Sequence, residues 1–239
     1  MSKVKPAGIT NVVLCNQALS RTIDRAHTLP GLLVWFGYSG LGKTMSAVNA
    51  SIKNKGFYVQ CKSTQTRKSF LESILKEMGI APAKNLSDMT DQICVELMQS
   101  HRPLIIDEAD YLVDKNKIMM VMDIYEGSQA AIMLVGEEKL PAKLSVYEKI
   151  HNRVLDWVAA QPCEAADVEA LARMFAPSIK IEPEVLEGLN IATKGVARRI
   201  VTDLNRMVNF ARDEGIDEIT VTNYTLPFTT GQAPRGRKL

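Results

Sequence analysis

The chain has 239 residues and a net charge of +2, and 46% of its residues are hydrophobic. This length suits one large core, or a core with a small second domain, and the composition is that of a globular protein. The sequence holds no apolar run near the roughly 18 residues of a membrane-spanning helix, and no apolar signal core follows its first residues. We therefore expect a cytoplasmic protein that makes no membrane contact.

The four cysteines are scattered along the chain, with no C-x-x-C pair and no pair of histidines nearby. Reduced thiols of a cytosolic protein are therefore favoured over a zinc site at Cys15, Cys61, Cys94 and Cys163. The 29 basic and 27 acidic residues nearly cancel, so the net charge neither requires nor excludes binding to nucleic acid. A DNA-binding surface would need locally clustered cations.

From residue 32 to residue 159, short apolar runs alternate with segments of helical periodicity. Strands are predicted over 32–36, 57–61, 103–107, 130–135 and 154–159. Helices are predicted over 43–54, over 69–78, from Ser87 onward, and over about 116–125. Gly79 is a candidate C-cap and Ser87 a candidate N-cap of these helices. The alternation predicts an α/β fold in which helices cover both faces of a mostly parallel sheet.

Beyond Pro162 the pattern changes to helical periodicity with no convincing strand between the helices. The predicted helices cover about 164–176, 183–192 and 196–213. The simplest expectation is an α/β domain over 1–161 followed by a small all-helical domain over 162–227. A flexible basic tail is expected over 228–239, where Arg235, Arg237 and Lys238 lie.

The strongest motif lies between the first predicted strand and the first predicted helix, and it matches G-x-x-x-x-G-K-[ST]. Its residues are Gly37, Tyr38, Ser39, Gly40, Leu41, Gly42, Lys43 and Thr44. The glycines let backbone N–H groups surround an anion, and the helix that follows adds its positive N-terminus. Lys43 supplies a cation for the β- and γ-phosphates, and Thr44 supplies a hydroxyl ligand for Mg²⁺. This segment is therefore predicted to bind the phosphates of ATP.

A second motif is an apolar strand that ends in two carboxylates, Leu104-Ile105-Ile106-Asp107-Glu108. Beside a phosphate loop, Asp107 is predicted to hold Mg²⁺ through water, and Glu108 to orient and polarise the attacking water. A solvated acidic strand end is the alternative explanation for such a motif on its own. The adjacent acidic pair favours an ATPase that hydrolyses its nucleotide over a protein that only binds it.

Two arginines are further candidates for contacts with the nucleotide. Arg153 precedes the fifth predicted strand, where in a ring or filament it would reach the γ-phosphate of a neighbouring subunit. Arg198 opens the last long helix within Gly195-Val196-Ala197-Arg198-Arg199 and would close over the nucleotide from the helical domain. Ordinary solvated arginines at a strand edge and on a helix are the respective alternatives.

In their order and spacing, these motifs resemble the AAA+ ATPases. The counterparts are Walker A at 37–44, Walker B at 104–108, a finger arginine at Arg153, and a G-x-x-R sensor 2 from Gly195 to Arg198. The resemblance covers nearly the whole chain. It implies a P-loop AAA+ parallel sheet flanked by helices, a small all-helical lid domain after it, and ATP with Mg²⁺ as cofactors.

Within this superfamily, the sequence looks most like the DNA-transposition ATPases, the Mu-type phage transposition protein B and its relatives in Tn7-like and IS21-like elements. The similarity rests on the compact core, on Asp107-Glu108-Ala109-Asp110-Tyr111-Leu112, and on Leu134-Val135-Gly136 at the end of the fourth strand. It implies an ATP-dependent homo-oligomer on double-stranded DNA that selects target DNA and stimulates a transposase.

Two features depart from these relatives. The Mu protein has an N-terminal helix-turn-helix domain, whereas about 30 residues precede the first predicted strand here. AAA+ proteins usually carry Asn, Ser or Thr as sensor 1 after the fourth strand, whereas this chain has Gly136-Glu137-Glu138. A carboxylate that faces a γ-phosphate would be repelled, so Glu137 is expected to point elsewhere or to act through water.

DNA contact is then assigned to the α/β core. Cations follow the second strand and Walker B, in regions that face the central channel of related assemblies; they are Lys62, Arg67, Lys68, Lys115 and Lys117. Solvated surface side chains are the alternative, and the lysine-rich composition predicts phosphate contacts without sequence reading. Two other functions stay open: a helicase- or clamp-loader-type AAA+ ATPase, and a weakly hydrolysing scaffold that recruits a partner when ATP is bound.

Overall fold

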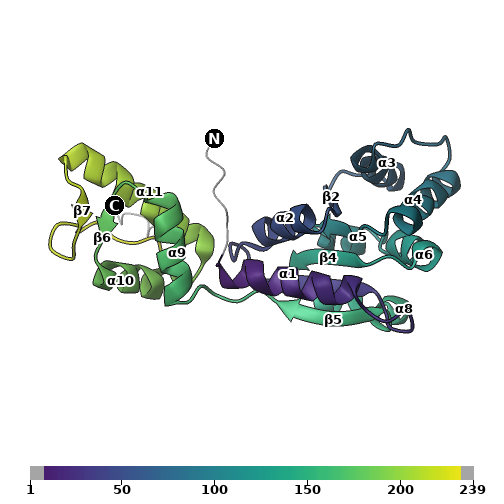
Figure 1. The fold of residues 1–239 in the computed structure, drawn as a ribbon, viewed down its shortest axis with the longest axis horizontal. Helices are drawn as coiled ribbons and strands as arrows, with labels where there is room; N and C mark the ends of the chain where they lie inside the picture. The colour runs from purple at the N-terminus through teal and green to yellow at the C-terminus, as the bar shows by residue number, and fades with distance from the viewer. Residues whose placement is uncertain (1–7, 233–239) are drawn as a thin grey trace, which may run out of the picture. The chain divides into compact units, whose positions relative to one another are not determined.

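The chain divides into two compact units. The structure, a computed structural model, describes residues 8–232 (Figure 1). The sheet unit contains residues 11–39 and 43–160, and the C-terminal unit contains residues 161–232 together with 8–10 and 40–42. Within the described part of the chain, no helix is both long and apolar enough to cross a membrane.

The sheet unit alternates strands with helices, as the apolar pattern predicts. Its strands are β1 (Leu32–Gly37), β2 (Phe57–Gln60), β3 (Leu104–Asp107), β4 (Ile132–Glu137) and β5 (Val154–Ala159). The helices of this part of the chain are α1 (Thr10–Ile23), α2 (Lys43–Lys53), α3 (Arg67–Met78), α4 (Leu86–Ser100), α5 (Asp110–Asp114), α6 (Met119–Ser128), α7 (Leu140–Leu144) and α8 (Glu148–His151). Gly79 ends α3 with a φ of 76°, which confirms the predicted C-cap.

The five strands are parallel and lie in the order β2-β3-β4-β1-β5. This arrangement confirms the predicted α/β class with a parallel sheet flanked by helices. Because β4 pairs with β1 on one side and with β3 on the other, the carboxyl ends of these three strands meet at one edge. Ligands of open α/β sheets bind at this edge, so the two sequence motifs lie where such a site is expected.

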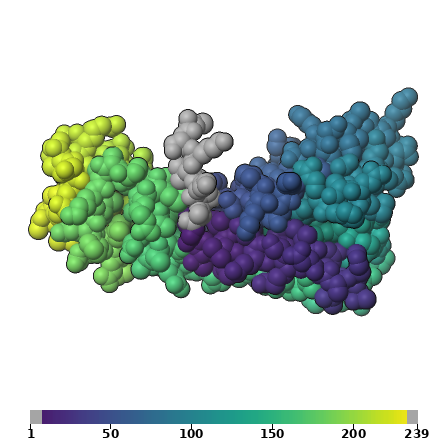
Figure 2. All heavy atoms as spheres, viewed as in Figure 1, coloured from purple at the N-terminus to yellow at the C-terminus, as the bar shows by residue number. Residues whose placement is uncertain are grey.

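Alternate strand residues face opposite layers of the sheet unit. Val34, Ile106 and Leu134 belong to a large core that side chains of α3, α4, α6, α7 and α8 complete. Trp35 and Met133 are buried as well, and the sulfur of Met133 lies 3.9 Å from the thiol of Cys15 in α1. Burial on both faces explains the continuous apolar runs of the strands. In the view of Figure 2, the visible surface of this unit includes α1 in purple and α2 in blue.

The C-terminal unit packs three helices around its own apolar core. These are α9 (Ala165–Phe175), α10 (Pro183–Thr193) and α11 (Ala197–Glu214). Leu171, Leu189, Ile200 and Leu204 are among the buried residues between them. The helical character of this part is confirmed. The unit also contains two short parallel strands, β6 (Lys180–Ile181) and β7 (Glu218–Ile219). They were not predicted, because strands of two residues give no periodic signal in the sequence.

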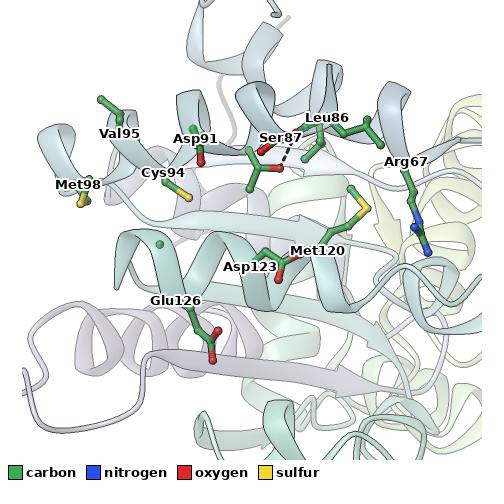
Figure 3. Close-up of a pocket in the computed structure, with 13 residues that line it drawn as sticks. Arg67, Leu86, Ser87, Asp91, Cys94, Val95, Met98, Met120, Asp123 and Glu126 are labelled. Carbon is green, nitrogen blue, oxygen red and sulfur yellow. Dashed lines mark hydrogen bonds between the residues drawn. The ribbon is translucent and has the colours of Figure 1, made fainter. Parts of the chain in front are cut away.

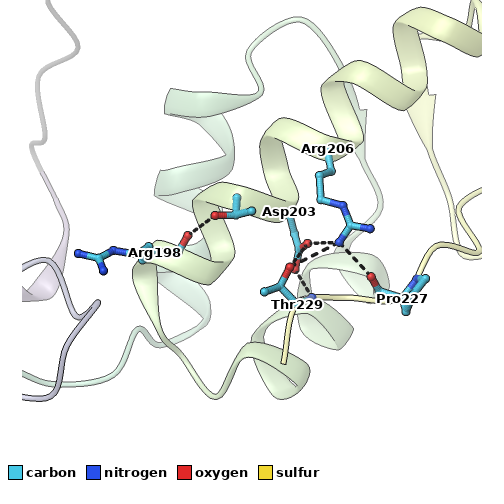
Figure 4. Close-up of polar contacts among 6 residues, drawn as sticks. Arg198, Asp203, Arg206, Pro227 and Thr229 are labelled. Carbon is cyan, nitrogen blue, oxygen red and sulfur yellow. Dashed lines mark hydrogen bonds and ion pairs between the residues drawn. The ribbon is translucent and has the colours of Figure 1, made fainter. Parts of the chain in front are cut away.

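A buried carboxylate ties the end of the described chain to α11 (Figure 4). Asp203 is fully buried and accepts hydrogen bonds from the Thr229 N–H at 2.7 Å and the Thr229 hydroxyl at 2.8 Å. The Arg206 guanidinium donates to Asp203 at 2.9 Å and to the Pro227 carbonyl at 3.1 Å. Thr229 falls within the segment expected to be a tail, whereas Arg235, Arg237 and Lys238 lie outside the described residues.

Some local features differ from the sequence expectations. The N-cap of α4 is Asn85, whose side chain accepts from the Asp88 N–H, so the expectation for Ser87 was wrong. The predicted helix over 116–125 begins later, at Met119, because the chain turns through Asn116 with a φ of 56°. The sequence pattern assigned no element to α1, whose buried side chains cover the sheet.

Candidate active site

The loop between β1 and α2 has the backbone of an anion-binding loop. β1 ends at Gly37, and α2 begins at Lys43. Gly37, Gly40 and Gly42 have φ values of 152°, 87° and 86°, which glycine adopts at no steric cost. A Cβ at Gly42 would meet nothing within 4 Å, so the backbone conformation, and not a lack of space, explains this glycine. The Tyr38 side chain is 63% exposed in the same loop.

Lys43 lies in the field of several carboxylates at the sheet edge. Its ammonium donates hydrogen bonds to the Gly37 carbonyl at 2.7 Å and the Tyr38 carbonyl at 2.8 Å. Burial lowers the pKa of Lys43, and Glu108, Glu137, Asp107 and Asp110 oppose that shift. The Lys43 ammonium is therefore bound to the carbonyls of its own loop, and the Asp107 and Glu108 carboxylates favour its charged form.

Asp107 is fixed more firmly than a solvated strand end would be. It is 2% exposed, and its carboxylate accepts from the Tyr58 hydroxyl at 2.7 Å and from the Glu108 N–H at 2.8 Å. Burial raises the pKa of Tyr58, and its hydrogen bond to Asp107 adds to the shift, so this hydroxyl stays protonated and remains a donor. Thr44, the other candidate metal ligand, lies in the first turn of α2 and is exposed.

Glu108 has an unusual backbone and a perturbed carboxyl group. Its φ of 56° is uncommon for a residue other than glycine, and such outliers gather at functional sites. Burial raises the pKa of Glu108, and the neighbouring Asp107, Asp110 and Glu137 raise it further, whereas Lys43 opposes them. Glu108 is thus the member of the acidic pair with the affinity for a proton that a general base needs.

Asp110 links three elements at this edge, and the sequence pattern assigned it no role. Its carboxylate is nearly buried, accepts from the Glu137 N–H at 2.7 Å, and pairs with the Lys143 ammonium at 3.0 Å. Gly136 leaves space for this carboxylate, because a Cβ there would lie 2.3 Å from an Asp110 oxygen. The Glu137 backbone is held by this bond while its side chain is exposed.

The two candidate arginines have exposed side chains. Arg153 lies between α8 and β5, and its carbonyl accepts from the Leu32 N–H at 3.0 Å, which fixes its backbone against β1. Arg198 lies in the first turn of α11, where its carbonyl accepts from the Thr202 hydroxyl at 2.8 Å (Figure 4). Within the described chain, neither guanidinium forms a salt bridge with a carboxylate.

The structure brings the two basic segments of the sheet unit together. The Lys117 ammonium donates to the Gln65 carbonyl, and the Arg67 guanidinium reaches the Asn116 carbonyl at 3.5 Å. These contacts join the loop after β2 to the loop between α5 and α6. Lys62 and Lys115 are exposed, and Lys68 is 3.9 Å from Glu72 in a surface ion pair. The two segments that carry the cations predicted to contact DNA therefore touch through Arg67 and Lys117, and Lys117 is partly engaged by the protein itself.

The residues present fit a nucleotide with Mg²⁺. The glycine backbone, the start of α2 and Lys43 suit phosphate groups, and Thr44 and Asp107 offer hard oxygen ligands. Within residues 8–232, no group of three or more His, Cys, Asp or Glu side chains is placed to hold a metal ion. Thr44 and Asp107 are the residues that would hold a metal at this edge. The metal would supply charge neutralisation at the phosphates.

Comparison with protein families matches residues 26–144 to the family described as AAA domain. Comparison with curated proteins found no match. Among solved structures, Cdc6p from Pyrobaculum aerophilum is similar, at 15% identity and a TM-score of 0.64 over 91% of this chain and 66% of that chain.

Two further structures have the same fold. The Aeropyrum pernix ORC1 protein in complex with DNA matches at 15% identity and a TM-score of 0.65, over 93% of this chain and 65% of that chain. A point mutant of Thermotoga maritima RuvB matches at 15% identity and a TM-score of 0.62, over 92% of this chain and 68% of that chain. The chain spans about two thirds of the length of these proteins. Residues 26–144 are thus similar to the AAA domain family, and the chain shares the P-loop AAA+ α/β fold of these structures.

Proposed function

We propose that the chain binds ATP with Mg²⁺ at residues 37–44 and hydrolyses it to ADP and phosphate. The observation that carries this proposal is that the glycine loop after β1 and the acidic pair Asp107 and Glu108 after β3 lie at the same carboxyl edge of the sheet. In this proposal Lys43 would offset phosphate charge, Thr44 and Asp107 would hold the metal, and Glu108 would take a proton from the attacking water. Arg198 from the helical lid adds a further cation, and Arg153 serves a neighbouring subunit.

Replacement of Lys43 by alanine tests the nucleotide site. The variant should lose affinity for a non-hydrolysable ATP analogue by about 100-fold or more, because charge-assisted bonds to two phosphates disappear. Lys53→Ala, at the exposed far end of the same helix, is the control and should bind as the parent does. Unchanged affinity of Lys43→Ala in an analogue titration would refute the assignment of the phosphate loop.

The finer proposal is an ATP-dependent homo-oligomer on double-stranded DNA that selects target DNA and stimulates a transposase. The compact core, residues 107–112 and Leu134-Val135-Gly136, which resemble transposition ATPases, support it, and so does the proximity of the two basic segments. The ORC1 protein, which shares the fold, was solved in complex with DNA. Phosphate contacts by lysines would make this binding independent of DNA sequence.

A helicase- or clamp-loader-type activity is the second candidate, because the fold is shared with RuvB, a Holliday junction branch migration motor. Negative-stain images of the protein with ATP and duplex DNA distinguish the candidates. Helical filaments on DNA are expected for the transposition ATPase, and closed rings for the second candidate. No assembly would favour a nucleotide-controlled scaffold and contradict both.

A further inference from the structure

An open groove lies on the sheet unit between α4 and α6, with the start of α3 at one end (Figure 3). Its volume is about 710 Å³. Large apolar side chains of α4 line it while remaining half exposed: Leu86 is 41%, Val95 45% and Met98 46% exposed. Met120 of α6 lies near Leu86 at one end of the groove, and Val95 and Met98 lie at the other end. Exposed apolar side chains along a groove mark an interaction site more often than scattered ones do.

The charges around the groove are acidic. Asp91 of α4 and Asp123 and Glu126 of α6 line it, and all three are exposed. The sequences of α4 and α6 contain no lysine or arginine. Arg67 lies at the end of the groove, where its guanidinium reaches the Asn116 carbonyl at 3.5 Å. The groove therefore presents apolar walls with a negatively charged margin.

The two helices that form the groove are held close together at its floor. The Cys94 thiol donates to the Ile124 carbonyl at 3.6 Å, and a Cβ on Gly127 would lie 2.6 Å from the Cys94 sulfur. Burial raises the pKa of Cys94, and the Asp91 and Asp123 carboxylates raise it further, so the thiol stays neutral. The floor is thus packed and uncharged, and the groove exists without any rearrangement of α4 or α6.

We propose that this groove docks a basic amphipathic helix of a partner protein. A channel between two helices suits a third helix, whose apolar face would cover Val95 and Met98 of α4. Lysines or arginines beside that face would pair with Asp91, Asp123 and Glu126. Methionines such as Met98 and Met120 adapt to a range of apolar partners. The same carboxylates repel duplex DNA, and the docking requires neither bound nucleotide nor the proposed hydrolysis.

A synthetic peptide of about 14 residues, four helical turns, is the probe. It carries leucines at helical spacing on one face and lysines on both sides of them, and a fluorophore reports binding by anisotropy. The full chain should bind this peptide with an affinity that falls as salt rises, and should not bind a version with glutamate in place of lysine. Hydrogen exchange of the complex should show new protection in α4 and α6.

Paired variants test the charge and the apolar contacts separately. Asp123→Asn with Glu126→Gln should weaken peptide binding about fivefold, from two partly exposed ion pairs. Glu77→Gln with Glu96→Gln changes the net charge equally outside the groove and should bind as the parent does. Val95→Ser with Met98→Ser should also weaken binding, whereas Ile52→Ser, which is 73% exposed on α2, should not.

Three results would overturn the proposal. The first is no binding of the basic peptide by the parent protein, and the second is equal binding by all variants. The third is a change in the sedimentation mass of the protein alone on Val95→Ser with Met98→Ser, which would make the groove an interface between copies of this chain. ATP turnover of the charge variants at the parental rate would show that the fold and the nucleotide site remain intact.

Discussion

Glu108 combines a φ of 56° with a carboxyl group whose pKa is raised by burial and by three neighbouring carboxylates. Both properties oppose stability, since the backbone conformation is strained and the charged form of the side chain is disfavoured. Such an arrangement persists when surrounding structure enforces it, and here β3 and the buried Asp107 do so. The residue is thus poised to accept a proton.

Glu108→Gln should separate binding from hydrolysis. The amide keeps the shape of the side chain but takes no proton from water, so ATP turnover should fall about 100-fold or more, while ATP still binds. The variant should accumulate ATP-held oligomers, which filter binding and sedimentation would detect. Glu77→Gln, exposed on α3, is the control. Turnover of Glu108→Gln at the parental rate would show that Glu108 is not the catalytic residue.

The raised pKa of Glu108 also predicts how stability depends on pH. A folded-state pKa above the ordinary 4.5 means that folding is favoured by the protonated form, so this contribution is present at low pH and is lost as pH rises through the folded pKa. Glu108→Gln removes the cost of the charge. The variant should therefore have a higher melting temperature than the parent at pH 7, and the difference should shrink as pH falls toward 4.5.

A constant difference in melting temperature from pH 4 to pH 8 would contradict this origin of the pKa shift. The comparison belongs in nucleotide-free buffer, since bound ligand would stabilise the two proteins unequally.

The phosphate loop and the acidic pair could be proposed from local sequence, because each motif is contiguous and its chemistry depends on residue type. Asp110 and Gly136 were not predicted as a pair. Their relation arises from the pairing of β3 with β4, which brings residues from distant parts of the chain within van der Waals contact. No period or motif encodes such a contact in a single sequence.

At the level of elements, the carboxyl end of β4 is closely packed. A Cβ on Gly136 would approach Asp110 at 2.3 Å and the Leu140 side chain at 2.6 Å. Asp110 in turn anchors Lys143 of α7, so the end of β4 connects α5 to α7. The lack of room for a Cβ explains why position 136, just before the usual sensor 1 position, is a glycine.

Gly136→Ala should destabilise the protein by about 1–3 kcal/mol, because the added methyl group displaces Asp110 or α7. Gly188→Ala is the matched control, since it lies inside α10 and its Cβ would meet Phe228 at an ordinary 3.4 Å. That change should stabilise the protein by about 0.5–1 kcal/mol through helix propensity. Urea unfolding measures both, and equal effects of the two substitutions would show that the β4 end tolerates a side chain.

The elements that the sequence predicted well are those with a strong period or a clear cap. The five strands were predicted to within a few residues, because apolar runs bounded by glycine or proline define them. The helix α1 was not predicted, since polar residues such as Asn11, Asn16 and Thr22 are buried within it and blur its apolar stripe. The buried Asn16 side-chain N–H donates to the Val12 carbonyl at 2.7 Å. Only the folded chain shows that this buried donor has a hydrogen-bond partner.

On the scale of the whole molecule, the exposed Arg153 leads to a prediction about assembly. If it serves the site of a neighbouring subunit, ATPase activity should rise more steeply than linearly with protein concentration. Arg153→Ala and Lys43→Ala should each be inactive alone, yet a mixture should recover activity, because an intact arginine then faces an intact loop. A coupled assay over a range of mixing ratios measures this. No recovery, with both variants still co-assembling, would argue against a role between subunits.

DNA binding is the second prediction at this scale. If Lys62, Arg67, Lys68, Lys115 and Lys117 contact phosphates, affinity should fall steeply with salt and depend little on sequence. Each lysine removed should lower the slope of log K against log salt by about one unit. ATP should be required, since an oligomer brings many copies of a weakly basic surface onto one duplex.

The basic tail is the competing location for this DNA site. Truncation after Thr230 removes Arg235, Arg237 and Lys238 but keeps Thr229 and its bonds to Asp203. The truncated protein should therefore fold and still bind DNA, in a fluorescence titration at low salt. Loss of DNA binding on truncation, with binding retained when the five core cations are replaced, would place the site in the tail.

The strand order sets the distance between the phosphate loop and the acidic pair of the candidate site. Because β4 separates β1 from β3, the phosphate loop and the acidic pair stand two interstrand steps apart, about 10 Å from backbone to backbone. Main-chain hydrogen bonds between the strands therefore set the distance between the two motifs. Side-chain substitutions that keep these hydrogen bonds should leave this distance unchanged. Gly136, one residue before the end of β4, leaves the space beside this middle strand to Asp110 and Leu140.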